Sequence, residues 1–114
     1  MDKLQHLFQL QKLFGSKFTN FDELNEHERQ IKTLEFIDHL IEELIELRRE
    51  CPIRKHWSKK RFNIPDKQKQ LDEYVDALHF FITIALVNGW SAQNVYDAYL
   101  SKNAVNHQRQ DNSY

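Results

Sequence analysis

The chain has 114 residues, which is enough for one domain with a hydrophobic core and hardly enough for two. Its formal net charge of -1 gives no reason to expect a nucleic-acid polymer or an anionic membrane as partner. A single cysteine excludes an internal disulfide, and neither a signal peptide nor an apolar segment of membrane-spanning length is present, so we expect a soluble cytoplasmic protein.

Apolar spacing predicts a first helix over residues 2–14, ended by Gly15. A second helix should begin at Asn20, because Asn20 and Glu23 have the form of an N-cap with its reciprocal glutamate. It can continue to Cys51, where the following proline forbids more. A helix of roughly 30 residues is long for a globular protein, so a bend is expected near residues 26–30.

A third helix should have Pro65 in its first turn and end at Asn88 and Gly89. Because apolar residues point in every direction around it from 74 to 87, we expect it to be buried. A fourth helix should start at the N-cap Ser91, and its inward face should hold Val95, Ala98, Tyr99 and Val105. By composition alone, residues 106–114 are a frayed tail.

These elements, with short connections between them, predict one all-α domain over residues 1–114, a bundle of four to five helices. Two of the expected helices carry acidic clusters, E-E-x-x-E at Glu42–Glu46 and E-x-x-D at Glu73–Asp76. Carboxylates on a buried helix need partners or a metal. Without a His or Cys cluster, these oxygen ligands favour Mg²⁺ or Mn²⁺ over zinc.

Five carboxylates exceed what one Mg²⁺ takes from protein, so the surplus would bind a second ion or hold a water as general base. The set is Glu42, Glu43, Glu46, Glu73 and Asp76. The alternative for the upstream cluster is an ordinary solvated helix face.

Two further features have alternative interpretations. The basic loop over residues 52–65, around Trp57 and Phe62, suits nucleotide contact, but a solvated loop anchored in the core by Trp57 has the same pattern. His79, one turn beyond Asp76, either orients a ligand or is an ordinary core histidine with its hydrogen bonds satisfied.

Three segments together resemble the dimeric all-α dUTPases of the MazG-like nucleotide pyrophosphatase superfamily. They are Glu42-Glu-Leu-Ile-Glu46, Lys55-His-Trp-Ser-Lys59 and Leu71-Asp-Glu-Tyr-Val-Asp-Ala-Leu-His-Phe80. Leu7-Phe-Gln-Leu-Gln11 is similar to the N-terminal glutamine motif of that branch, and residues 99–114 are similar to its C-terminal motif. The resemblance therefore spans most of the chain and replaces the frayed tail with a nucleotide-binding segment.

The resemblance implies a role for each matching residue. The five carboxylates would bind Mg²⁺, with two or more ions when substrate is bound, and Glu43 and Glu46 would be catalytic. Gln11, Trp57 and His79 would lie near base and sugar. The residues that would approach phosphates or close the pocket, some from a neighbouring subunit, are Lys59, Lys102, Asn106, Arg109 and Tyr114.

The resulting hypothesis is a Mg²⁺-dependent nucleoside triphosphate pyrophosphohydrolase that converts dUTP to dUMP and pyrophosphate. We expect a homodimer or higher homo-oligomer, encoded by a cell or a phage, with neither a membrane nor a nucleic-acid polymer as partner. One alternative is a dCTPase or a broad house-cleaning dNTP pyrophosphatase on the same scaffold. The other is a non-catalytic helical interaction protein.

Overall fold

The computed structural model describes residues 1–52 and 64–112. These ranges contain helices and connecting segments, with no strand among them. The all-α class is thereby confirmed. The elements are α1 (Lys3–Gly15), the short 3-10 helix η1 (Phe21–Glu23), α2 (Glu26–Arg49), α3 (Lys67–Val87) and α4 (Ala92–Asp111).

Short polar side chains fix the starts of the four α-helices. Each N-cap side chain accepts a hydrogen bond from the backbone N–H three residues further on, which satisfies one of the free donors at a helix start. The caps are Asp2, Asn25, Asp66 and Ser91. The predicted cap at Ser91 and the predicted end of the third helix at Asn88 and Gly89 are confirmed, and Gly89 has the positive φ of 73° that suits glycine.

The predicted start of the second helix at Asn20 is wrong. Asn20 makes no side-chain capping hydrogen bond, and Asn25 with Glu28 forms the reciprocal cap instead. The physical reason is Phe21, whose buried ring lies so close to Gly15 that a Cβ there would be 2.7 Å from it. This contact holds residues 21–23 as a separate turn before α2 begins.

Two other boundaries also differ from expectation. α2 ends at Arg49 rather than at Cys51. Pro65 precedes the third helix instead of occupying its first turn, because Asp66 is the N-cap.

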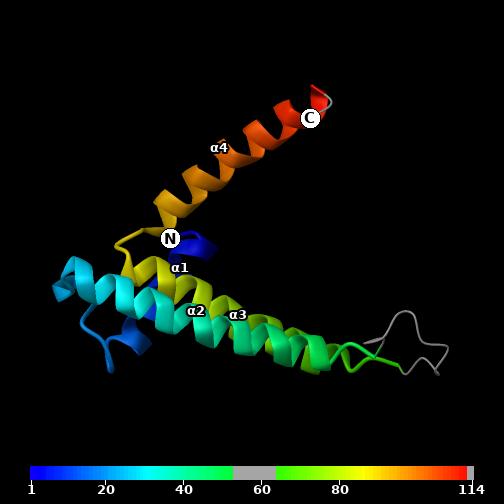
Figure 1. The fold of residues 1–114 in the computed structure, drawn as a ribbon, viewed down its shortest axis with the longest axis horizontal. Helices are drawn as coiled ribbons and strands as arrows, with labels where there is room; N and C mark the ends of the chain where they lie inside the picture. The colour runs from blue at the N-terminus through cyan, green and yellow to red at the C-terminus, as the bar shows by residue number, and fades with distance from the viewer. Residues whose placement is uncertain (53–63, 113–114) are drawn as a thin grey trace.

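The body of the molecule is built on a helical hairpin. α2 and α3 lie side by side and antiparallel along their length, and α1 packs against α3 (Figure 1). At the C-terminal end of α3, side chains from α1, α3 and α4 form the hydrophobic core. Its buried members are Phe8, Ile82, Ala85 and Ala92, packed against Leu4, Leu78, Leu86 and Val95.

α4 leaves this body at 105° to α3 and projects away from it (Figure 1). It continues as a helix to Asp111, so the frayed tail expected from composition is wrong for the described residues. Only its first turns contact α1, and the expected inward residues Ala98, Tyr99 and Val105 are exposed in the single chain. Val95 packs on the core as predicted.

The prediction that α3 is buried on all sides is also wrong for one chain. Tyr74 and Phe81 remain 60% and 57% exposed, and Leu71 is exposed as well. The reason is that α1, α2 and the start of α4 cover only part of the circumference of α3 in the described chain. Among the described helices, none is long and apolar enough to cross a membrane by itself. The bent pair of α3 and α4, with 105° between them, reaches that length and apolar composition only when the two helices are taken together.

Candidate active site

Three carboxylates from two helices meet where α2 and α3 run side by side. Glu43 belongs to α2, whereas Glu73 and Asp76 are three residues apart and therefore lie on the same side of α3. One carboxylate oxygen from each residue lies within 4.8 Å of the other two. Three hard oxygen ligands at this spacing are a donor set for one divalent cation such as Mg²⁺ or Mn²⁺.

Two oxygens of this carboxylate cluster are buried without a hydrogen-bond partner among the described residues. They are Oε2 of Glu43 and Oε2 of Glu73. A buried carboxylate oxygen without a partner costs free energy, unless a proton or a cation neutralises it. The orphaned oxygens therefore fit a site that holds a divalent ion.

Burial and neighbouring negative charges also raise the pKa values of two carboxyl groups in this cluster. Burial, followed by the negative charges of Glu46 and Asp76, raises the pKa of Glu43 above its ordinary value of 4.5. Burial also raises the pKa of Glu73, with the charge of Glu46 and a hydrogen bond to it as the next causes. Both groups therefore hold a proton more tightly than an ordinary carboxyl does, and a cation would replace that proton.

The two other predicted ligands lie beside the cluster. Glu46 is exposed on α2, one turn after Glu43, and its charge acts on both Glu43 and Glu73. Glu42 points into solvent, with a side chain 73% exposed and one oxygen 3.8 Å from Nδ1 of His39. Among the described residues, neither Glu42 nor Glu46 joins the three-residue cluster. The roles of Glu42 and Glu46 as metal ligands stay predictions.

A cavity of about 610 Å³ adjoins the carboxylates. Glu43 and Asp76 lie on its wall together with Gln11 of α1 and His79 of α3. Four of the predicted site residues, from three helices, therefore share one cavity. Its remaining lining is apolar and comprises Leu7, Leu10, Phe14, Val75, Leu78, Phe80 and Ile82. A pocket with an acidic part and an apolar part suits a ligand with a metal-bound anionic group and a flat ring.

Two polar side chains in this cavity have clear positions. The Gln11 amide donates from Nε2 to Oγ1 of the buried Thr83 at 3.0 Å. His79 is exposed and lines the cavity, so the alternative of a buried core histidine is wrong.

The sequence reasoning missed an aromatic group beside the cavity. Phe80 lines the cavity and stacks on His39 of α2, with 5.5 Å between ring centroids, and Phe36 lies 6.2 Å from the same ring. His39 also contacts Glu42. Its position three residues before Glu42 on the acidic helix was the signal in the sequence that pointed to it.

The remaining predicted substrate-binding residues lie elsewhere. Trp57, Lys59 and Tyr114 are outside the described residues. Three more are on α4, which leaves the far end of α3 (Figure 1). None of the three lines the carboxylate-bearing cavity of its own chain. They are Lys102, Asn106 and Arg109.

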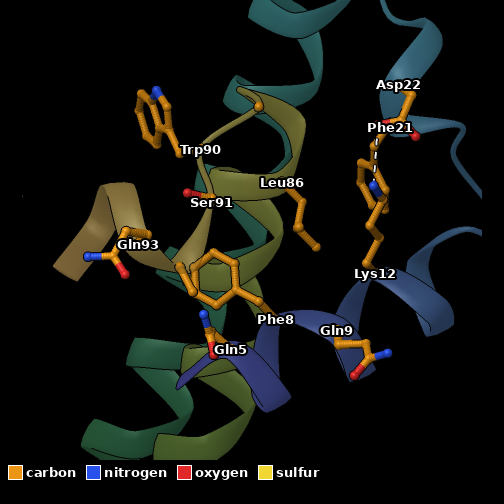
Figure 2. A pocket seen from close by; sticks show the side chains of 12 residues that line it. Gln5, Phe8, Gln9, Lys12, Phe21, Asp22, Leu86, Trp90, Ser91 and Gln93 are labelled. Atoms are coloured by element: carbon orange, nitrogen blue, oxygen red, sulfur yellow. Dashed lines mark hydrogen bonds and ion pairs between the residues drawn. The ribbon is translucent and has the colours of Figure 1, made fainter. Parts of the chain in front are cut away.

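A second cavity, of about 440 Å³, lies at the C-terminal end of α3. Figure 2 shows Phe8 and Leu86 there, between the indole of Trp90 and the ion pair of Lys12 with Asp22, whose atoms are 3.3 Å apart. This cavity contains none of the predicted site residues. We therefore place the candidate active site at the carboxylate cluster.

Comparison with known proteins gives one family. A family model described as dUTPase matches residues 3–92 and 81–114, two ranges that together cover most of the chain. The chain has no significant match among curated proteins, nor among solved structures.

Proposed function

This chain belongs to the dUTPase family, and from that membership we propose that it is a Mg²⁺-dependent pyrophosphohydrolase with dUTP as its preferred substrate. Membership of the family supports a hydrolase that acts on nucleotide phosphoric anhydrides. The observation that carries the proposal is the cluster of Glu43, Glu73 and Asp76, two of which, Glu43 and Asp76, lie on the wall of a largely apolar cavity that Gln11 also lines.

In this proposal the carboxylate cluster holds the metal and the apolar part of the cavity holds the base. The orphaned oxygens of Glu43 and Glu73 fit a cation. Bound Mg²⁺ would supply electrostatic stabilisation of the triphosphate and of the charge that develops on the leaving phosphate. Glu46 lies at the solvent side of the cluster, where a carboxylate can take a proton from the attacking water.

The reaction is a hydrolysis without a covalent enzyme intermediate. A water oxygen forms a bond to phosphorus, the phosphoric anhydride bond breaks, and one water proton passes to the carboxylate base. dUMP and pyrophosphate are the products.

The shape of the single chain supports a homo-oligomer as the working form. A compact monomer of 13.8 kDa would expose about 6,600 Å², whereas this chain exposes 9389 Å². Its radius of gyration is 17.8 Å, against about 13 Å for a compact domain of this length. The excess surface is of the size that obligate dimers bury. It includes large apolar side chains on α2, α3 and α4, among them Leu34, Ile41, Tyr74, Phe81 and Tyr99.

An oligomer also gives α4 a role. Most of the stability of a helix in a protein comes from packing of its apolar face, and most of α4 is exposed in its own chain. We therefore include Lys102, Asn106 and Arg109 of a neighbouring copy as the residues that approach the phosphates.

The test is a panel of dNTPs assayed with Mg²⁺ for released pyrophosphate. The expected result is fastest hydrolysis of dUTP, and loss of about 100-fold or more of that activity in Glu43→Gln. Glu35→Gln is the matched control, because Glu35 is exposed on the same helix and pairs only with Lys32 among the described residues. A preference for dCTP or equal rates for all bases would favour the related pyrophosphatases, and no hydrolysis of any dNTP would contradict the enzyme proposal.

A further inference from the structure

Thr83 is a polar residue in an otherwise apolar part of α3. It is only 5% exposed, and among the described residues it is the one polar residue that is buried as a whole. Its hydroxyl lies between the backbone of its own helix and the Gln11 amide of α1. A buried hydroxyl in a core helix needs a physical reason, because valine has the same shape and no polar group to satisfy.

The hydrogen bonds of Thr83 fix which end of the Gln11 amide faces it. The Thr83 hydroxyl donates to the carbonyl oxygen of His79 at 2.8 Å, and a carbonyl can only accept. The single hydroxyl proton is thereby used, so Oγ1 can only accept from Gln11. The amide must therefore turn its NH₂ group, and not its oxygen, toward Thr83, as the 3.0 Å contact from Nε2 has it.

The opposite end of the Gln11 amide is left for the cavity. Gln11 lines the cavity wall. Its Oε1 accepts no hydrogen bond from another described residue, and this oxygen is accessible rather than buried. The cavity thus meets a hydrogen-bond acceptor, Oε1, next to the second N–H of the same amide. Without Thr83, rotation about the last side-chain torsion of Gln11 would exchange the positions of Oε1 and the NH₂ group.

Pyrimidine bases differ in the edge that such an amide would meet. Uracil has a donor at N3–H next to carbonyl acceptors, whereas cytosine has an acceptor at N3 next to its amino donor. If the apolar walls hold the base in one place, the amide atom opposite N3 decides: Oε1 accepts from N3–H of uracil, whereas N3 of cytosine, an acceptor, needs the reversed amide. A site whose polar groups are left unpaired by the wrong substrate discriminates strongly against it.

We propose that Thr83 is a positioning residue that sets selectivity for uracil over cytosine, by holding the Gln11 amide with its oxygen toward the base. This inference rests on the proposed dNTP hydrolysis. It concerns a residue that touches neither metal nor substrate and acts through Gln11.

The test compares two substitutions of equal or smaller size. Thr83→Val removes the hydroxyl and keeps the shape, so the amide is released, and the ratio of kcat/KM for dUTP to kcat/KM for dCTP should fall about 10-fold, mainly through KM. Thr83→Ser keeps the hydroxyl and should keep that ratio. Thermal unfolding shows whether each variant is folded, and Thr83→Ala replaces Thr83→Val if the latter is not.

A double-mutant cycle separates positioning from a merely structural role. In a Gln11→Ala background there is no amide to hold, so Thr83→Val should leave the remaining selectivity ratio unchanged. A folded Thr83→Val protein with wild-type selectivity, or an equal effect of Thr83→Val with and without Gln11, would overturn the proposal while leaving dUTP hydrolysis in place. Absence of all dNTP hydrolysis in the wild type would instead contradict the proposed function itself.

Discussion

The two halves of α3 meet opposite conditions. The half over residues 80–87 holds four of the five buried residues of the helix, and polar groups there are paired. Thr83 bonds to Gln11, and at the helix end Asn88 donates to Thr33 at 3.0 Å. The half over residues 67–79 carries Glu73, with an orphaned buried oxygen, and exposes several apolar side chains.

This difference shows how one helix serves both fold and site. The C-terminal half is packed for stability by Phe8 and the start of α4. The N-terminal half keeps an unpaired carboxylate oxygen, on Glu73, that a fold optimised for stability alone would avoid, which is the pattern expected of a functional site. The two halves should therefore respond differently to substitution.

The largest contrast should come from truncating one apolar residue in each half. Ile82 is buried in the core cluster, and Ile82→Ala should lower the free energy of unfolding by about 2–5 kcal/mol. Val75 lies on the cavity wall and is partly exposed, so Val75→Ala should cost about 1 kcal/mol or less. Urea unfolding of the two variants at matched protein concentration measures this, and equal losses would show that both halves are packed alike.

A smaller effect is expected from charge in the N-terminal half. The pKa of Glu43 and that of Glu73 are raised above 4.5 in the folded chain, chiefly by burial. Above the ordinary pKa the folded state then binds more protons than the unfolded state. Without metal, stability should therefore fall as the pH rises from 4.5 through the raised pKa values. Added Mg²⁺ should restore stability most at the upper end of that range, because it replaces the proton.

Glu73→Gln sharpens this prediction. The amide carries no charge, so the metal-free variant should lose less stability than the wild type as the pH rises above 4.5, and should gain less from Mg²⁺. Urea unfolding in EDTA and in Mg²⁺ across that range gives both slopes, with Glu35→Gln as the exposed control. Identical slopes for wild type and Glu73→Gln would mean that this carboxylate does not carry the linkage.

The sequence alone predicted the four α-helices, because the period of apolar residues and the capping residues are local signals. Of the five predicted carboxylates, the structure brings Glu43, Glu73 and Asp76 together. The sequence could not decide between Asn20 with Glu23 and Asn25 with Glu28, since both pairs have the spacing of a reciprocal cap. Contact of Phe21 with Gly15 decides it. The bond between Gln11 and Thr83 joins residues 72 apart, and no local pattern encodes it.

Burial of α3 was overestimated for a related reason. An apolar circumference predicts that every side will be covered, but it does not say by which chain. α1 and α2 cover part of the helix, and the exposed Tyr74 and Phe81 lie on the part that they leave open. Under the proposed oligomer, a second copy covers it.

The smallest effect is expected where the packed half of α3 ends. Gly89 adopts φ 73°, and no atom lies within 4 Å of a Cβ added there, so Gly89→Ala meets backbone strain alone. It should lower the free energy of unfolding by about 1–2 kcal/mol. Gly89→Asn should lose less, because asparagine tolerates the left-handed conformation that ends a helix. Urea unfolding ranks the wild type, Gly89→Ala and Gly89→Asn by stability. If Gly89→Ala is as stable as the wild type, then the turn that directs α4 away from α3 does not depend on this backbone conformation.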